Sequence, residues 1–204
     1  MEMNVNQLPG CRVYDYILVI NPHEELSNKI ADIRKEFNRA YQVTGGQVAK
    51  TNLHLVSFSQ IEMKEERIKN RLKTIAMGHP PFKVELRDFG SFPSHTIHMN
   101  VVSKIPIQTL VKTIRTEAQS LMKFDDENKP YFNLEPHITI ASKLKPWQYE
   151  KGWLEYSNKH YMGRFIADAM LLLKKQKEDK TWQIVQRFEF QNLPVHVKQG
   201  DLFG

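Results

Sequence analysis

Cysteine is almost absent from this sequence, since Cys11 is the only one among 204 residues. A single cysteine cannot form an intramolecular disulfide, and it has no cysteine partner with which to build a structural zinc site. A reducing compartment suits such a chain, and we therefore expect a cytoplasmic protein.

Long hydrophobic runs and glycine-rich loops are also missing. The longest apolar runs, 16–20 and 167–173, are too short to span a bilayer, and residues 1–10 lack the apolar stretch of a signal peptide. We expect no membrane segment and no export. No glycine-rich phosphate loop precedes a helix, which argues against a nucleotide kinase or a dinucleotide-dependent enzyme.

The composition is that of a globular protein with a modest excess of positive charge. Hydrophobic residues make up 41% of the chain, and 29 Lys and Arg stand against 23 Asp and Glu, for a net charge of +6. This length and hydrophobic content suit one domain over residues 1–204. The excess of cations favours anionic partners such as RNA or nucleotides.

Hydrophobic periodicity predicts alternating strands and helices along the whole chain. The expected strands are 13–20, 52–58, 82–89, 95–102, 135–142, 165–174 and 182–190. The expected helices are 24–41, 59–78, one that begins near 107, and 147–160. An Asn21 cap and a capping box that starts at Ser59 are the expected starts of the first two helices.

The order of these elements indicates an internal duplication. A unit of strand, helix, strand with histidine, and helix occurs twice, and His54 and His137 are equivalent positions in the two copies. This predicts an α+β fold with two pseudo-symmetric lobes of antiparallel or mixed sheet and outer helices around a central cleft. The lobes are expected at roughly 13–80 plus the end of the chain and at 81–165, with exchanged strands. The two histidines would then meet near the pseudo-two-fold axis.

Strand alternation predicts which side chains accompany each histidine. In Pro136-His137-Ile138-Thr139-Ile140, His137 and Thr139 share one face. In the earlier strand the same rule places His54, Val56 and Phe58 together and Ser57 on the opposite face.

Two histidines on either side of one phosphodiester can divide acid and base catalysis. A histidine titrates near neutral pH, so one ring can accept a proton from the nucleophile while the other donates one to the leaving oxygen, and no metal is needed. Thr139 could donate its hydroxyl to a non-bridging phosphate oxygen. A histidine on a strand is more often a structural residue, so spacing alone leaves both interpretations open.

The two histidine strands resemble the paired His-x-Ser/Thr signatures of the 2H phosphoesterases. Pro136-His137-Ile138-Thr139-Ile140 looks like the second signature, Asn52-Leu53-His54-Leu55-Val56 resembles the first, and 88–93 resembles the family's turn between central strands. The resemblance implies a metal-independent phosphodiesterase or 2′-5′ RNA ligase-like enzyme, for which we expect no cofactor and a monomeric state. Its implied substrates are RNA or nucleotides with a 2′,3′-cyclic phosphate or a 2′-5′ linkage, and His54 and His137 would be its acid and base.

The first signature departs from the family pattern because Val56 stands where a hydroxyl is expected. Ser57 could replace that hydroxyl only if a β-bulge shifted the strand. One alternative is therefore a catalytically weakened RNA- or nucleotide-binding module with the same fold. Another is a protein-interaction domain that neither binds nor turns over such ligands.

Other polar residues are weaker candidates. His95 and His98 have odd spacing on one strand and so face opposite ways, which argues against a shared metal ion. His98 and Asn100 could line the cleft, although a structural role is about equally expected. Tyr14 and Tyr16 share a face of the first strand, where an aromatic ring could stack on a base, but a half-buried tyrosine is the commoner case.

Lysines and arginines near the second histidine strand and the final hairpin could form a basic rim. They are Lys143, Lys145, Arg164, Lys174, Lys175, Lys177 and Lys180. A solvated hairpin tip is the more common explanation for such a cluster.

Overall fold

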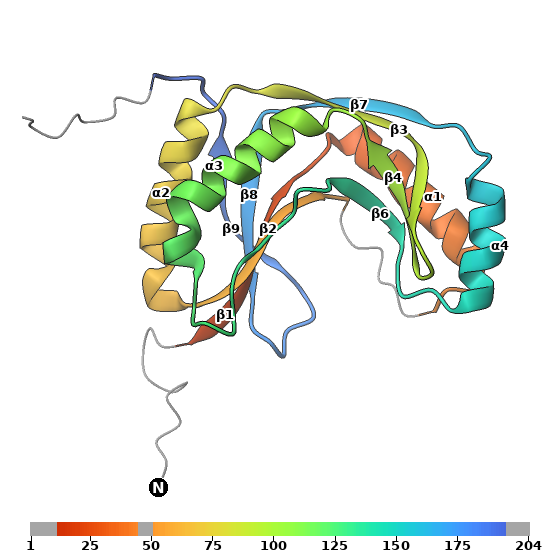
Figure 1. Ribbon diagram of the computed structural model, residues 1–204, viewed down its shortest axis with the longest axis horizontal. Helices are drawn as coiled ribbons and strands as arrows, with labels where there is room; N and C mark the ends of the chain where they lie inside the picture. Colours follow the sequence, from red (N-terminus) through yellow and green to blue (C-terminus); the bar gives the residue numbers. More distant parts are fainter. Residues whose placement is uncertain (1–11, 45–50, 195–204) are drawn as a thin grey trace, which may run out of the picture.

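Two antiparallel sheets form the framework of the protein (Figure 1). The computed structural model describes residues 12–44 and 51–194. The first sheet has the order β5 (Tyr131–Phe132), β2 (Leu53–Ile61), β1 (Val13–Ile20), β8 (Ala169–Lys175) and β9 (Gln183–Glu189). The second has the order β6 (His137–Ala141), β4 (Thr96–Val101), β3 (Phe82–Phe92) and β7 (Met162–Ala167).

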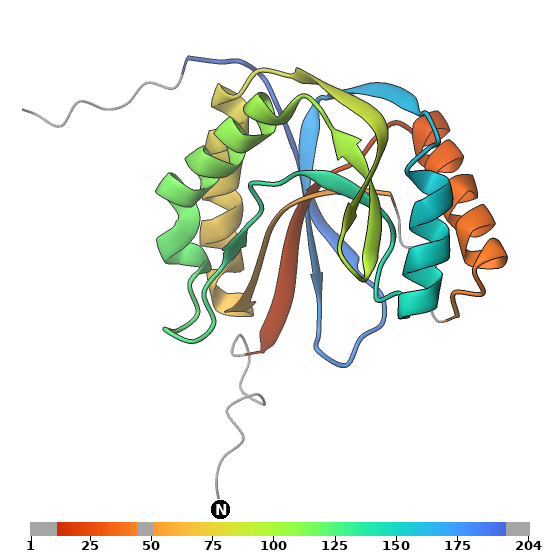
Figure 2. The same ribbon diagram turned by 45° about the vertical axis from the view of Figure 1, so that its right-hand side comes forward.

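Four helices cover the outer sides of the described sheets, which confirms the expected α+β class. The helices α2 (Glu65–Gly78) and α3 (Lys104–Met122) pack beside the first sheet. The helices α1 (Glu24–Ala40) and α4 (Pro146–Tyr156) pack beside the second sheet. Figure 2 shows the same division into two halves from another direction.

The helices are exchanged between the two halves. The helix α1 follows β1 in the chain but contacts β6 and β7 of the other sheet, while α3 follows β4 but contacts β2. Close packing of α1 on α4 explains part of this, because a side chain at Gly152 would meet the Phe37 ring at 2.7 Å. The exchange therefore involves α1 and α3, and the short strand β5 also follows α3 in the chain but joins the first sheet.

One expected strand is in fact two. The run predicted as a single strand over 165–174 divides at Asp168, where the chain leaves β7 in the second sheet and enters β8 in the first. The backbone N–H of Phe190 donates to the Asp168 carbonyl at 2.8 Å, so the end of β9 supports this crossing. Both halves of the run are apolar, and the sequence contains no strong turn signal there.

The first helix begins at Glu24 as expected, but its expected cap and the expected start of the second helix were wrong. The cap of α1 is His23, whose Nδ1 accepts from the N–H of Leu26 at 3.3 Å. Strand β2 continues to Ile61, and a 3₁₀ turn at Glu62–Lys64 leads into α2. The Ser59 hydroxyl donates to Asp15 Oδ1 at 2.7 Å on the neighbouring strand instead of capping a helix.

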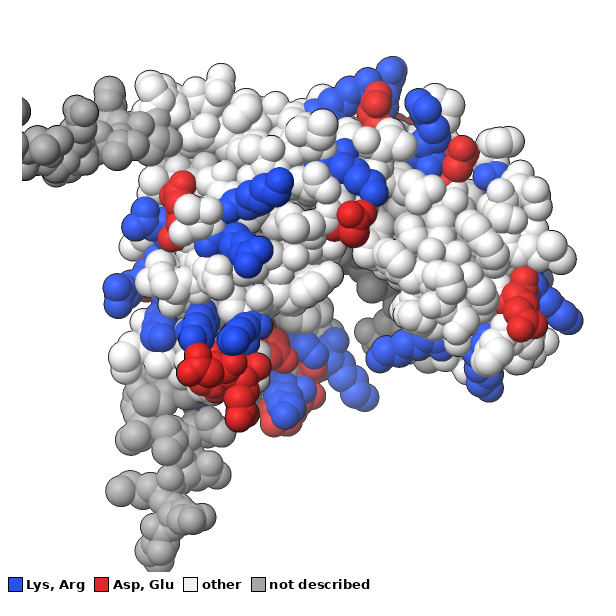
Figure 3. Space-filling view, viewed as in Figure 1, with Lys and Arg blue, Asp and Glu red and all other residues white. Residues whose placement is uncertain are grey.

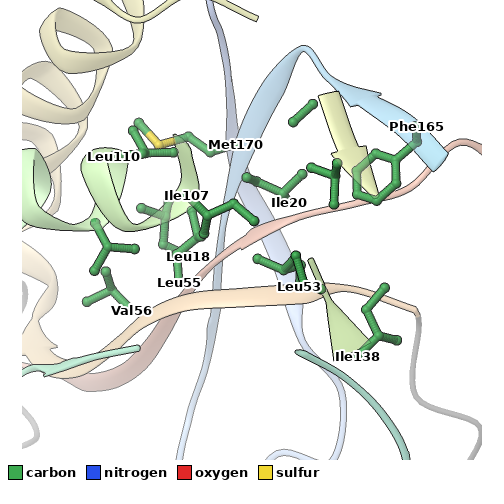
Figure 4. Packing of buried hydrophobic residues seen from close by; sticks show 14 of the residues in the cluster. Leu18, Ile20, Leu53, Leu55, Val56, Ile107, Leu110, Ile138, Phe165 and Met170 are labelled. Carbon is green, nitrogen blue, oxygen red and sulfur yellow. The ribbon is translucent and has the colours of Figure 1, made fainter. Parts of the chain in front are cut away.

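A β-bulge in β2 interrupts its alternation of faces. Val19 pairs with His54 and Leu18 pairs with Val56, so Leu55 has no opposite residue on β1. Leu55 and Val56 are consequently both fully buried, as the close-up in Figure 4 shows. Beyond the bulge the phase is reversed, and Val56 no longer shares the face of His54.

Side chains from both sheets meet in one hydrophobic cluster, which includes Leu18 and Ile107 on one side and Ile138 and Phe165 on the other (Figure 4). This shared core fixes the two sheets relative to one another, and with them the two histidine strands. None of the described helices combines the length and the apolar character that crossing a membrane requires.

Candidate active site between the sheets

His54 and His137 come from different sheets and lie close enough to interact. His54 is on β2 and His137 is the first residue of β6, and both are half-buried. Burial, and then the nearby charge of His137, lower the pKa of His54 below its ordinary value. Figure 3 shows that the surface is hollowed between the half over α2 and α3 and the half over α4, with Lys and Arg along its lower edges.

The backbone sets the proton position on His137. Its Nδ1 lies 2.8 Å from the carbonyl oxygen of Glu135. A carbonyl can only accept, so we assign the hydrogen to Nδ1, which leaves Nε2 as the proton-accepting nitrogen of the neutral ring. In the protonated ring Nε2 also carries a hydrogen, and it can donate that hydrogen while Nδ1 keeps its bond.

Thr139 shares the face of His137 on β6, as alternation predicted, and the residue is half-buried. Its backbone carbonyl accepts from Arg34 Nε at 2.8 Å. The same guanidinium donates from Nη1 to Thr51 Oγ1 at 3.3 Å, just ahead of β2. Arg34 therefore connects α1 to both histidine strands.

Sequence reasoning missed Arg34, although a signal was present. Arg34 lies four residues after Ile30 and three before Phe37, on the apolar stripe of α1 where a charge is unexpected. It is 7% exposed, and burial lowers its pKa. A cation in that position indicates a structural role that depends on defined partners.

Asn133 joins the bulge of β2 to the segment before His137. Its backbone N–H donates to the Leu55 carbonyl at 2.8 Å, and its side-chain Nδ2 donates to the His54 carbonyl at 3.0 Å. Its Oδ1 accepts from the N–H of Glu135 at 3.1 Å. Because Glu135 in turn holds His137, a short chain of hydrogen bonds connects the two histidines through the backbone.

His98 and Asn100 lie on the same face as His137. The His98 ring is 4.5 Å from the ring of Phe92 and 5.0 Å from that of His137, between centroids. A side chain at Gly90 would come within 2.7 Å of His98 Nε2 and would also collide with Asn100, so glycine gives these two residues their space. His98 Nδ1 is buried and has no hydrogen-bond partner among the described residues.

His98 should make the protein less stable in acid. Burial, and then the charge of His137, lower its pKa from 6.5 to about 4, so between these values the unfolded chain binds more protons than the folded one. The contribution of neutral His98 to the free energy of unfolding is fully present above the pKa of the unfolded state. It is lost as pH falls toward the pKa of the folded state, by roughly 3 kcal/mol in all. We expect His98→Asn to flatten this part of the pH dependence in urea unfolding, whereas His95→Asn, at an exposed position, leaves it unchanged. An equal pH slope in both variants would contradict this role.

The two tyrosines of β1 do not line the site. Tyr16 is 1% exposed on the face toward the helices, and its hydroxyl donates to Glu65 Oε2 at 2.9 Å. Tyr14 shares that face, and both are structural residues because β1 turns its even positions inward. The aromatic side chain near His54 is Tyr131, which is 60% exposed with its ring centroid 6.2 Å away. It belongs to the two-residue strand β5, which is too short to recognise in the sequence.

Val56 and Lys174 also lie elsewhere than expected. Val56 is in the core, where the bulge directs it. Lys174 lies over the Tyr14 ring and forms ion pairs with Glu62 and Glu65, so it belongs to the helix side of the sheet and not to a basic rim.

A cavity of about 770 Å³ lies where β1 begins and β2 ends. On the open face of β2 the order is His54, Ser57 and Ser59, and Asp15 pairs with Ser59. The lining residues include Arg12, Asp15, Ser59, Phe124, Asn128 and Lys177. Two cations, an aromatic ring and an amide thus line this cavity, together with the carboxylates of Asp15 and Glu178.

The comparison with protein families identifies the chain. The model of the 2′-5′ RNA ligase superfamily matches residues 22–179, which include both histidine strands. The chain belongs to this superfamily, a member group of the 2H phosphoesterases. A comparison with curated proteins gives no match.

Solved structures share the fold at low sequence identity. TT0787 of Thermus thermophilus superposes with a TM-score of 0.60 at 14% identity, over 87% of this chain and 98% of that one. LigT of E. coli in complex with 3′-AMP gives 0.59 at 13% identity, over 87% and 98% of the two chains. LigT in complex with phosphate gives the same values. These similarities establish the fold.

Proposed function

We propose that this chain is a metal-independent phosphodiesterase, or a 2′-5′ RNA ligase-like enzyme, in which His54 and His137 are the base and the acid. The observation that carries the proposal is the pair of half-buried, electrostatically interacting histidines from opposite sheets. The proposed substrates are RNA or nucleotides with a 2′,3′-cyclic phosphate or a 2′-5′ linkage.

The electrostatics favour His54 as the base in hydrolysis. Its lowered pKa keeps the ring neutral at pH 7, ready to take a proton from water. The water oxygen bonds to phosphorus, the bond to the leaving ribose oxygen breaks, and protonated His137 gives that oxygen a proton from Nε2. In ligation the same steps run in reverse, so the two histidines exchange roles. The Thr139 hydroxyl, on the face of His137, would bind a non-bridging oxygen.

One observation supports an RNA end over a smaller phosphodiester, and a second supports a nucleotide substrate in general. The cavity beyond Ser59 offers Arg12 and Lys177 for phosphates and Phe124 for a base. The related fold of LigT has been solved with 3′-AMP and with phosphate, which are a nucleotide and its anionic part. We further propose that the enzyme acts as a single-domain monomer in the cytoplasm, consistent with its one cysteine.

The test is hydrolysis, in the presence of EDTA, of a panel of 2′,3′-cyclic nucleotides, short RNAs ending in a cyclic phosphate, and 2′-5′ linked dinucleotides. We expect turnover, with a higher kcat/KM for the short RNAs than for the mononucleotides. Binding without turnover would instead support the weakened binding module. If the protein neither binds nor turns over any substrate of the panel, the proposal is refuted.

A further inference from the structure

We propose that Ser57 is the phosphate-binding hydroxyl of the first histidine strand, at a position that the family pattern does not assign. The inference rests on the proposed function and extends it, because it completes the set of groups that hold the phosphate. In the family pattern this hydroxyl stands two residues after the histidine, where this chain has Val56.

The pairing of β2 with β1 places Ser57 on the face of His54. His54 pairs with Val19, and Ser57 pairs with Ile17, two residues earlier on β1. Residues two apart on a regular strand share a face, and directly paired residues lie on the same side of a sheet. The extra residue Leu55 thus moves the next position on the His54 face from Val56 to Ser57.

Burial supports the same assignment. The pattern along β2 is buried at Leu53, Leu55, Val56 and Phe58, and half-buried at His54 and Ser57. An unbroken strand would bury every second residue, so two adjacent buried residues mark the change of phase. Ser57 is therefore half-buried on the same face of β2 as His54.

The Ser57 hydroxyl is available to a ligand. Within the described ranges it makes no hydrogen bond, whereas the next hydroxyl on that face, Ser59, is bonded to Asp15 at 2.7 Å. The neighbour of Ser57 on its other side is Tyr131 of β5, a largely exposed residue. Ser57 from the first sheet and Thr139 from the second can then donate to one phosphate from opposite sides.

Asn133 maintains the bulge that gives Ser57 this position. It satisfies the carbonyl groups of His54 and Leu55, the two residues at which the ladder to β1 is interrupted. A bulge leaves backbone groups without a ladder partner, and buried groups of that kind need another. The inferred arrangement is thus built into the fold by a residue 79 positions after His54.

The test compares Ser57→Ala with Ser120→Ala on α3. Turnover is measured with a short RNA that ends in a cyclic phosphate, and binding of inorganic phosphate is followed by phosphorus NMR. We expect Ser57→Ala to lower kcat/KM about ten- to a hundredfold and to weaken phosphate binding, as the loss of a hydrogen bond to a charged group does. Ser57→Thr, which keeps the hydroxyl, should retain most of the activity. Ser120→Ala, at an exposed position on α3, should match the wild type.

A second variant tests whether the phosphate-binding hydroxyl belongs at position 57, as inferred here, or at position 56, as in the family pattern. Val56→Thr restores a hydroxyl at the family position, but here it places that hydroxyl in the core beside Leu55 (Figure 4). We expect a lower temperature of unfolding and no gain in turnover. A gain in turnover in Val56→Thr would overturn the role of Ser57, and so would an active wild type whose turnover Ser57→Ala does not impair. Either result would leave the proposed function standing.

Asn133→Asp tests the bulge. The carboxylate can still accept from Glu135, but it cannot donate to the His54 carbonyl, so the position of Ser57 should be lost together with that bond. We expect turnover to fall, and Ser57→Ala to cost little more in this background, since the two changes remove one arrangement. If the effects of Asn133→Asp and Ser57→Ala on turnover are fully additive, Asn133 does not act through the position of Ser57. A wild type that neither binds phosphate nor turns over substrate would overturn the proposed function and, with it, the role of Ser57.

Discussion

Alanine at His54 or at His137 will lower turnover by about a hundred- to ten-thousandfold, the range that one positioned acid or base contributes. In the proposed mechanism each ring transfers one proton, and no neighbouring side chain on its strand can replace it. Both rings are half-buried, so their loss should leave the fold intact. The measurement is steady-state hydrolysis of the best substrate of the panel, with circular dichroism and thermal unfolding of each variant.

The matched control is His95→Ala, which removes an exposed histidine and should leave kcat and KM unchanged. The double variant of His54 and His137 should be only slightly slower than either single variant, because the residues of one catalytic unit act together. Folded single variants that keep more than half of the wild-type turnover would rule out the two-histidine mechanism.

The pH profile adds a readout that a structural role would not affect. Since the pKa of His54 is lowered, the base stays unprotonated to a lower pH than an ordinary histidine would, and the acid limb of kcat/KM should lie below pH 6.5. In His54→Asn the remaining activity should lose that limb.

The two histidine strands were predictable because each carries its information locally. In β6 no bulge occurs between His137 and Thr139, so simple alternation places both on one face correctly. The same rule failed in β2, where Leu55 is inserted without any proline or glycine to announce it. The partner that stabilises the insertion, Asn133, is remote in sequence and lies in a segment with no regular pattern.

The spatial arrangement of the helices was not predictable for a different reason. Amphipathic periodicity shows that α1 and α3 each bury one face, but it does not identify the sheet that receives it. The choice depends on close contacts such as that of Phe37 with Gly152 on α4. Duplicated units therefore predicted the class of fold and the meeting of the histidines, but not the exchange of helices.

Arg34 shows how much the exchange contributes to the site. Because α1 packs under the second sheet, its guanidinium reaches the Thr139 carbonyl of β6 and the Thr51 hydroxyl ahead of β2. If α1 covered the first sheet, this connection to β6 would not exist. The helix that begins in one repeat thus helps to fix the histidine strand of the other.

We therefore expect Arg34→Ala to destabilise the protein by about 2–4 kcal/mol, since it leaves a cavity and removes the donors to Thr139 and Thr51 in the interior. Urea unfolding measures this loss. On the same helix Arg39→Ala, at an exposed position, should change stability by no more than about 0.5 kcal/mol. A comparable loss in both variants would show that the buried contacts of Arg34 contribute nothing specific.

Arg34→Met distinguishes packing from positioning. Methionine refills most of the volume but donates no hydrogen bond, so it should recover part of the stability. It should not recover turnover, because methionine cannot donate to the Thr139 carbonyl and so cannot hold the strand that carries His137 and Thr139. A positioning role predicts a fall in kcat that exceeds any rise in KM, since the groups that act in the transition state are displaced. Full activity in a stable Arg34→Met variant would limit Arg34 to a role in folding.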